Sequence, residues 1–261
     1  MKLTIYQIDA FTDQVFKGNP AAVCPLTEWL ADDVLLKIAS ENNLSETAFY
    51  VPSENNFEIR WFTPSVEVDL CGHATLATAF VLRNHENFKE NTISFYSHRS
   101  GNLSVTVQEN RFVLNFPTDK FIEVSLTEEL LSATDKTPIS AYKGKTDYML
   151  VFENQEEIKT IQPNLSLIAQ LNARGIIATA KGENHDFVSR FFAPAVGVNE
   201  DPVCGSAHTT LTPYWAGQLN KKELSAFQLS NRSGELHCRL LNDRVELAGK
   251  AVLYMKGEIY I

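Results

Sequence analysis

The sequence predicts an α+β protein made of two similar lobes, and internal repetition is the main reason. RWFTPSVEV at 60–68 aligns with RFFAPAVGV at 190–198 at an offset of 130 residues. Three extra residues then change the offset to 133, at which Cys71-Gly72 aligns with Cys204-Gly205, and RSGNLSV aligns with RSGELHC farther on. Ordered matches explained by one insertion indicate the duplication of a unit of about half the chain. Each half also combines many short strand-like runs with an apolar helix, as two α+β lobes would.

The first half is expected to form strands around one buried helix. Runs rich in β-branched and aromatic residues, broken by turn residues, predict strands at 3–11, 21–26, 47–51, 57–62, 92–97, 103–108 and 111–116. Thr27 is expected to cap a helix that runs to about Asn42. A second helix should begin near Gly72, and residues 74–82 are apolar nearly all round. Such a helix belongs inside a structure rather than on its surface.

The second half repeats this order less regularly. It predicts strands at 147–152, 175–180, 188–194, 236–241, 244–248 and 251–255, with helices at 165–172 and from Gly205. We therefore expect lobes near 1–118 and 119–261, with the last strand free to return to the first lobe. Clefts between lobes are favoured places for small-molecule sites, so the Cys71 and Cys204 turns are expected to face such a cleft.

Composition excludes several classes of protein. The 261 residues carry 23 Lys plus Arg against 32 Asp plus Glu, a formal charge of −9, so binding to nucleic acid or to an anionic membrane is not expected. Asp9 and Asp13 interrupt the apolar stretch that a secretory signal needs, and no apolar run is long enough to span a bilayer. The four cysteines lack a CxxC pair, and a cytoplasmic location with reduced thiols is expected. No dinucleotide fingerprint, complete phosphate-binding loop or metal-ligand spacing is present, so neither a cofactor nor a metal is expected.

The two Cys-Gly turns are the most suggestive chemical feature. Each lies at the expected start of a helix, where free N–H groups and the helix dipole favour an anion and lower a thiol pKa. A buried, inert filler is the alternative for Cys71 and for Cys204, because free cysteine is commonly buried. Their position as a pair related by the repeat makes the two interpretations about equal.

Three polar residues accompany these turns. His73 and Ser206 stand at the first turns of their helices, and Asp201 precedes Ser206 in the loop NEDPVCGS. A Ser-His-Asp triad is not supported, because no GxSxG elbow is present. A polar cluster that binds a substrate and moves protons fits better, although Asp201 could simply form the turn before Pro202. Glu46, at the edge of an apolar strand, is suited to acid–base work, with an ordinary exposed strand-edge residue as the alternative.

Four long strings give the chain a resemblance to a known family. QIDAFTDQVFKGNPAAV at 7–23, NLSETAF at 43–49, FTPSVEVDLCGHATLATA at 62–79 and FFAPAVGVNEDPVCGSAH at 191–208 resemble the PhzF family of phenazine-biosynthesis-like isomerases. The resemblance covers essentially the whole chain. It implies a fold like that of diaminopimelate epimerase, with two lobes related by an approximate twofold axis, each a barrel-like sheet around a central helix.

The resemblance also implies roles for particular residues. Glu46 matches the acid/base of the family, and the substrate-contacting positions match Ser45, Gly72, His73, Asp201, Gly205 and Ser206. In the phenazine enzyme the reaction is a cofactor-free isomerisation of a dihydro-hydroxyanthranilate. The expected function is therefore an isomerase of a small carboxylate-bearing metabolite, working without a cofactor, with catalytic Glu46, His73 and Asp201. A homodimer is left open.

The cysteines keep two alternatives open. Related epimerases and proline racemase use one cysteine from each lobe, at positions that match Cys71 and Cys204, whereas the phenazine enzyme does not rely on such a pair. The chain could therefore be a two-cysteine racemase or epimerase. It could also be a metabolite-binding protein that keeps the cleft without catalysis. Glu46 is favoured as the base because it lies in the NLSETAF string of the family.

Overall fold

The chain divides into two compact units in a computed structural model that describes residues 1–54 and 56–261. Unit 1 comprises Met1–Asn115 and Ala248–Ile261, and unit 2 comprises Phe116–Leu247. Both units mix strands and helices, which confirms the predicted α+β class. Over the described residues, no helix has both the length and the apolar character needed to cross a membrane.

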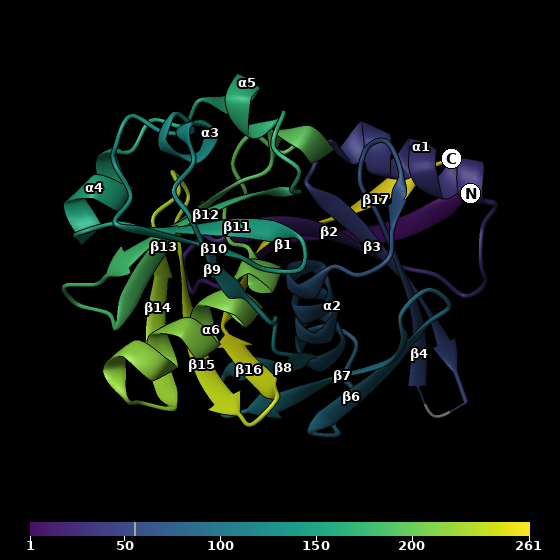
Figure 1. The fold of residues 1–261 in the computed structure, drawn as a ribbon. Helices are drawn as coiled ribbons and strands as arrows, with labels where there is room; N and C mark the ends of the chain where they lie inside the picture. Colours follow the sequence, from purple (N-terminus) through teal and green to yellow (C-terminus); the bar gives the residue numbers. More distant parts are fainter. Residues whose placement is uncertain (55) are drawn as a thin grey trace. The chain divides into compact units, whose positions relative to one another are not determined.

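Unit 1 is a mixed sheet with one central helix (Figure 1). Its strands are β1 (Lys2–Ala10), β2 (Asn19–Pro25), β3 (Glu46–Ser53), β4 (Asn56–Phe62), β5 (Glu67–Val68), β6 (Thr92–Ser97), β7 (Gly101–Gln108), the first part of β8 (Arg111–Pro117) and β17 (Ala251–Tyr260). The order β17–β1–β2–β3–β4–β6–β7–β8 is antiparallel except at the β2–β3 and β4–β6 pairs. In the parallel β2–β3 pair, Ala21 lies opposite Glu46, so Glu46 begins its strand beside a fully buried position.

Helix α2 (Gly72–Asn84) is the buried helix that the sequence predicts. Nine of its 13 residues are buried, and it packs against β1, β2, β3, β7 and β17 (Figure 1). Burial of an apolar helix against several strands removes most of its surface from water, and this is the main source of its stability. The start of α2 is therefore held firmly by the core of unit 1.

Helix α1 (Asp32–Asn42) begins later than predicted. The helix expected from Thr27 is wrong over its first turn, because Leu26 N–H bonds to the Tyr50 carbonyl and Trp29 Nε1 donates to Glu58 Oε2 at 2.6 Å. These contacts tie the segment to β3 and β4 in non-helical form. The N-cap is instead the extended Ala31, and the acidic first turn of α1 complements the helix dipole.

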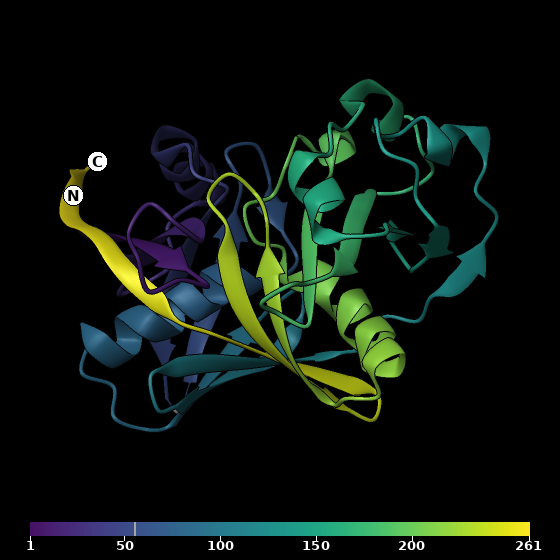
Figure 2. The same cartoon turned by 90° about the vertical axis from the view of Figure 1, so that its left-hand side faces the viewer.

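The two chain ends lie side by side in unit 1 (Figure 2). Strand β17 runs antiparallel to β1 along its whole length. The Met1 ammonium donates to the Ile261 carbonyl, and Ile261 N–H donates to the Met1 carbonyl at 2.8 Å. The last strand thus completes the sheet that the first strand begins.

Unit 2 repeats the plan with more short elements. Its elements are β9 (Ile122–Val124), α3 (Glu128–Leu131), β10 (Ser140–Lys143), β11 (Asp147–Val151), α4 (Gln155–Thr160), α5 (Leu165–Ile168), β12 (Gly175–Lys181), β13 (Phe187–Phe192), the 3₁₀ turn η1 (Pro194–Val196), α6 (Gly205–Leu219), β14 (Glu223–Gln228), β15 (Gly234–Leu241) and β16 (Arg244–Gly249), which carries the chain back into unit 1. The sheet order is β9–β10–β11–β12–β13–β14–β15, with parallel pairs at β11–β12 and β13–β14.

The helix predicted at 165–172 is wrong over its second half. Helix α5 stops at Ile168, after which Gln170 and Leu171 N–H groups bond to carbonyls three residues back. This tighter pattern turns the chain so that Gly175 can begin β12. An added Cβ at Gly175 would lie 2.2 Å from the Phe192 carbonyl oxygen, so the neighbouring strand requires glycine there.

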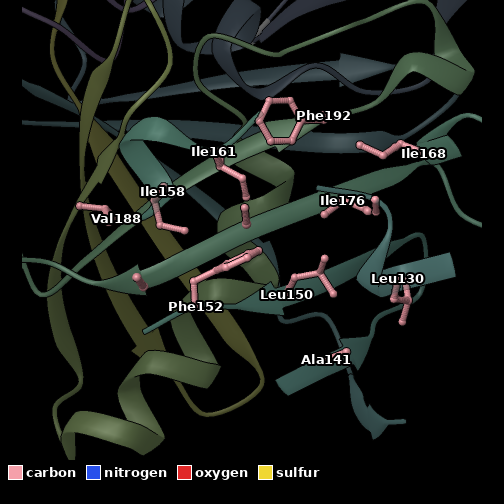
Figure 3. Close-up of a cluster of buried hydrophobic side chains, with 13 residues drawn as sticks. Leu130, Ala141, Leu150, Phe152, Ile158, Ile161, Ile168, Ile176, Val188 and Phe192 are labelled. Atoms are coloured by element: carbon pink, nitrogen blue, oxygen red, sulfur yellow. The ribbon is translucent and has the colours of Figure 1, made fainter. Parts of the chain in front are cut away.

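The core of unit 2 lies between its sheet and the short helices. Buried side chains of β11, β12 and β13 meet Ile158 and Ile161 at the end of α4, with Phe152 and Phe192 among the largest (Figure 3). Helix α6 packs against β14 and β15 and contains Pro213. Proline cannot donate to the carbonyl of residue 209, and that carbonyl accepts from Asp119 N–H at 3.1 Å instead. Helix α6 therefore continues through the proline.

Candidate active site

Helix α2 presents an uncapped N-terminus. Cys71 is its N-cap in extended backbone (φ −138°, ψ 108°), and no side chain in the described part of the chain caps it. The Cys71 carbonyl accepts from the Thr75 N–H at 3.1 Å and from the Thr75 hydroxyl at 2.6 Å, which fixes the turn. The first N–H groups of α2 carry partial positive charge and suit an anionic group.

Glu46, His73 and Cys71 form one cluster in unit 1. Glu46 Oε2 lies 3.2 Å from His73 Nε2, and His73 Nδ1 lies 3.4 Å from Cys71 Sγ, so the imidazole stands between the carboxylate and the sulfur. The contact between Oε2 and Nε2 is off the line of a hydrogen bond, and among the described residues neither atom has a hydrogen-bond partner. The side chain of Glu46 is 18% exposed and that of His73 is 8% exposed. Glu46 is therefore the member of the cluster that solvent reaches most easily.

Burial controls the protonation of this cluster. It raises the pKa of the Cys71 thiol, and the neighbouring Glu46 charge raises it further. Burial opposes protonation of His73, but Cys71 and Glu46 outweigh it and raise the His73 pKa. Burial also raises the pKa of Cys204, with the Asp201 charge acting in the same direction. The expectation that the helix start would lower the thiol pKa is wrong, because loss of hydration outweighs the helix dipole.

An arginine–glutamate clamp supports the turn before α2. Arg60 on β4 donates from Nε and Nη2 to the two oxygens of Glu67 on β5, at 2.7 and 2.9 Å. The guanidinium also lies over the Phe62 ring, 5.1 Å from its centre. Arg99 adds bonds to Glu67 and to Asp69, two residues before Cys71. Hydrogen bonds from Arg60 and Arg99 therefore fix the loop that leads to Cys71.

Unit 2 contains a second clamp of the same kind. Arg190 on β13 donates from Nε and Nη2 to the two oxygens of Glu200, again at 2.7 and 2.9 Å, with Phe192 4.9 Å below the guanidinium. Arg190 Nη1 also donates to the Ile161 carbonyl at 2.9 Å. Bidentate pairs of this kind fix geometry well because two parallel hydrogen bonds define the orientation.

Helix α6 begins in the same way as α2. Cys204 is its N-cap in extended backbone, and no side chain of the described residues caps the helix. The Gln228 side chain holds the loop by accepting from Cys204 N–H at 2.9 Å and donating to the Asp201 carbonyl at 2.6 Å. Ser206 is exposed, and its hydroxyl lies 3.2 Å from Cys204 Sγ. The backbone carbonyl of Asp201 thus helps to fix the turn before α6.

Arg174 is the site residue that sequence reasoning missed. It donates to the buried Asp147 from Nε at 2.9 Å and from Nη2, and Nη2 also donates to Ser206 Oγ at 2.9 Å. These contacts join residues 27 and 32 positions apart, so no local motif could reveal them. The available signal was a lone arginine at the start of an apolar strand, next to Gly175.

Gly205 is not required by the packing of α6. A methyl group added there would meet only Leu247 Cδ1, at 4.0 Å. The glycine leaves open space at the helix start beside the exposed Ser206. Such space allows a ligand to approach the backbone closely.

The structure brings the predicted residues together in two sets. Unit 1 gathers Glu46, Cys71 and His73, with Ser45 before Glu46 and Gly72 at the first position of α2. Unit 2 gathers Cys204, Gly205 and Ser206 with Arg174, and the Asp201 charge raises the pKa of the Cys204 thiol. The catalytic and binding roles of these residues stay predictions.

Comparison with known proteins gives consistent matches over the full length. A family model described as "Phenazine biosynthesis-like protein" matches residues 8–257. A protein of Pseudomonas aeruginosa named an uncharacterized isomerase is 51% identical over 260 residues, which cover 99% of each chain. The crystal structure of a phenazine biosynthesis protein of the PhzF family from Enterococcus faecalis matches with a TM-score of 0.98 and 46% identity, over 100% of both chains. A Pseudomonas aeruginosa structure described as a predicted epimerase has a TM-score of 0.74 and 17% identity over 99% of both chains, and so shares the fold.

Proposed function

Because the chain belongs to the PhzF family of isomerases, we propose that it isomerises a small carboxylate-bearing metabolite without a cofactor, with Glu46 moving a proton between two carbons. The observation that carries the proposal is the position of Glu46. Its carboxylate lies at the start of β3, partly open to solvent, 3.2 Å from His73 on the first turn of α2. The proximity of a carboxylate, an imidazole and an N–H-rich helix start in one unit supports Glu46 as the base and His73 as a second proton carrier.

The proton transfer needs one base that works twice. An oxygen of Glu46 takes the proton from a C–H bond next to a carbonyl or enol system, and the bonding electrons move into that system. The same carboxyl then returns the proton to another carbon, so the product is an isomer and no other reagent is consumed. His73 Nε2 lies 3.2 Å from Oε2 of Glu46, and the other carboxylate oxygen takes the proton from the substrate. A positioned acid–base group contributes roughly 10²–10⁴-fold to a rate.

The substrate carboxylate is the remaining part of the proposal. The N–H groups at Gly72, at the start of α2, suit an anion, and Ser45 lies beside the base. In unit 2 we propose Gly205, Ser206 and Asp201 as substrate contacts. Two observations support this: the space beside Gly205 is open, and the positively charged Arg174 donates a hydrogen bond to Ser206 Oγ. Charge-assisted contacts of this kind orient a carboxylate strongly.

The two-cysteine mechanism has less support. It requires a carbon acid to approach both sulfurs, yet Cys71 is 6% exposed and Cys204 is 4% exposed. Glu46 offers more surface than either. In the Glu46 mechanism the two sulfurs pack the helix starts and take no proton from the substrate.

The test begins by finding a substrate. Small cyclic carboxylates are screened by thermal shift, because a ligand of the folded state stabilises it in proportion to its occupancy. Hits are incubated in D₂O, and NMR follows both isomerisation and deuterium entering the carbon skeleton. A hit that binds without exchange in the wild-type protein would indicate a binding protein instead.

Glu46→Gln then identifies the base. This variant keeps the size of the side chain and removes the basic oxygen, so turnover should fall at least a hundredfold with melting temperature nearly unchanged. Glu41→Gln, an exposed position on α1, is the matched control and should keep full activity. Wild-type turnover by Glu46→Gln would refute the assignment.

Alanine variants of the cysteines decide between the two mechanisms. In the Glu46 mechanism, Cys71→Ala and Cys204→Ala lose stability of about 1–3 kcal/mol and keep most of their activity. A folded alanine variant as inactive as Glu46→Gln would replace the Glu46 mechanism with the two-cysteine one.

A further inference from the structure

We propose that Glu46, Cys71 and His73 form a Zn²⁺ site, and that Zn²⁺ bound there blocks the proton transfer. The blocking part rests on the proposed function of Glu46, whereas the binding part does not. The cluster offers one carboxylate oxygen, one sulfur and one imidazole nitrogen, all within 4.8 Å of one another. A carboxylate, a thiolate and an imidazole are the three ligand types that zinc takes in proteins.

The separations in the cluster are close to those of a zinc site. Tetrahedral zinc with bonds of about 2.0–2.3 Å places neighbouring ligand atoms roughly 3.3–3.8 Å apart. The separations here are 3.2 Å between Glu46 Oε2 and His73 Nε2, and 3.4 Å between His73 Nδ1 and Cys71 Sγ. A metal takes one ring nitrogen, so it can use only one of these two pairs as it stands, and the third ligand atom must turn toward that nitrogen from within 4.8 Å. Three protein ligands leave a fourth position for water.

Two polar atoms of the cluster are buried without a hydrogen bond. His73 is buried, and its Nε2 has no hydrogen-bond partner among the described residues; the same holds for Glu46 Oε2. Leaving such atoms unsatisfied costs free energy, and a metal ion would satisfy both at once. The three side chains come from the start of β3 and the start of α2, which the core of unit 1 holds in place. The backbone that carries the three ligands is therefore fixed before a metal binds.

The ligand set selects the kind of metal. A thiolate with an imidazole favours zinc and its close neighbours over magnesium or calcium, which prefer oxygen ligands. On binding, the Cys71 thiol and the His73 imidazolium each release a proton to solvent, and bonds from zinc to sulfur and nitrogen replace the S–H and N–H bonds. The Glu46 oxygen that binds zinc no longer accepts a proton from carbon. Zinc should thus act as a reversible inhibitor.

Cys204 provides an internal comparison. It is also a buried N-cap cysteine, but its neighbours are the Ser206 hydroxyl at 3.2 Å and the charge of Arg174. An arginine beside the sulfur repels a metal cation. Removal of the Cys204 sulfur should therefore leave zinc binding unchanged.

The experiment measures binding without any substrate. Protein freed of metal by chelator is dialysed against Zn²⁺, and bound metal is counted by elemental analysis. Co²⁺ is then used as a spectroscopic probe, because a bond between thiolate and cobalt gives a charge-transfer absorption band. We expect one metal per chain and a clear band for wild type and for Cys204→Ser. Cys71→Ser should lose the band, and His73→Gln should bind Zn²⁺ at least tenfold more weakly.

Each outcome bears on one part of the proposal. Equal binding by wild type, Cys71→Ser and His73→Gln, or absence of the band in wild type, would overturn the site. Glu46→Gln provides a second measurement if either variant fails to fold, since it also removes a ligand and should weaken binding. Zinc that binds at this site without slowing isomerisation would overturn the inhibition alone. The role of Glu46 as the base is decided separately, by turnover of metal-free Glu46→Gln.

Discussion

His208 tests how strongly burial lowers the pKa of an imidazole near the start of α6. Its side chain is completely buried within α6, and Nδ1–H donates to the carbonyl of the N-cap Cys204 at 2.7 Å. Nε2 has no hydrogen-bond partner among the described residues, and the ring lies 5.8 Å from that of Phe187. Burial therefore lowers the pKa of His208 from 6.5 to about 4. The folded protein holds this imidazole neutral.

The sign of the effect on stability follows from this shift. Because the pKa is lower in the folded state, protonation favours the unfolded chain, so the stability is fully present above about pH 6.5 and is lost as the pH falls towards 4. One pKa unit corresponds to about 1.4 kcal/mol, so the difference between 6.5 and about 4 amounts to about 3 kcal/mol. Between pH 7 and pH 4.5 the loss from His208 should be about 2 kcal/mol.

Urea unfolding at pH 7 and pH 4.5 measures this loss. His208→Asn keeps a donor near the position of Nδ1 but does not titrate, so its loss of stability on acidification should be about 2 kcal/mol smaller than that of wild type. His98→Asn, at a half-exposed side chain in unit 1, is the control for exchanging a histidine for an asparagine outside the core. If His208→Asn lost as much stability as wild type between the two pH values, the buried neutral imidazole would not be the cause.

Three further predictions concern the start of α6 and its surroundings. Gly205→Ala should fold with a melting temperature close to that of wild type but bind any substrate found more weakly. Gly217→Ala, where the added methyl group meets open space, should raise the free energy of unfolding by about 0.5–1 kcal/mol and leave substrate binding unchanged. Gly175→Ala should destabilise unit 2 by about 2–4 kcal/mol in urea unfolding, because its Cβ would collide with the Phe192 carbonyl oxygen. Arg174→Met should raise KM much more than it lowers kcat, because it frees Ser206 without touching the base.

The large elements could be predicted because their signals are local. A Cys-Gly turn followed by an apolar run gave both buried helices, and the runs of β-branched residues gave most strands of both units. The errors lie where tertiary contacts outweigh local preference. Trp29 ties the segment after Thr27 to β4, and the turn after Ile168 is set by the need to enter β12.

The residues of the candidate site divide in the same way, into those with a local sequence signal and those placed by tertiary contacts. Glu46, His73 and both cysteines lie next to motifs that can be recognised in the sequence, so they could be named in advance. Arg174 could not, because its role depends on strand β11 bringing Asp147 alongside β12 and on the start of α6 bringing Ser206. The raised pKa of both thiols could not be predicted from the sequence either, since it depends on burial rather than on the helix start.

The repeat is best preserved where it supports the helix starts. Arg60 matches Arg190 at the offset of 130, and Glu67 matches Glu200 at the offset of 133. Both pairs form the same bidentate clamp at 2.7 and 2.9 Å. Each clamp ends a short distance before its Cys-Gly turn. An Arg–Glu clamp fixes the backbone of the turn without specifying the side chains around the helix start. The two copies could therefore diverge at those side chains without loss of the fold.

That divergence explains why the two helix starts differ in chemistry. Two residues after the N-cap cysteine, unit 1 has His73, which meets the carboxylate of Glu46, and unit 2 has Ser206, which meets the guanidinium of Arg174. One helix start thus has an imidazole beside a carboxylate, and the other has a hydroxyl that accepts a hydrogen bond from a guanidinium. The match between the halves therefore holds at the two Cys-Gly turns and fails two residues later, at the position that decides which charged side chain each helix start meets.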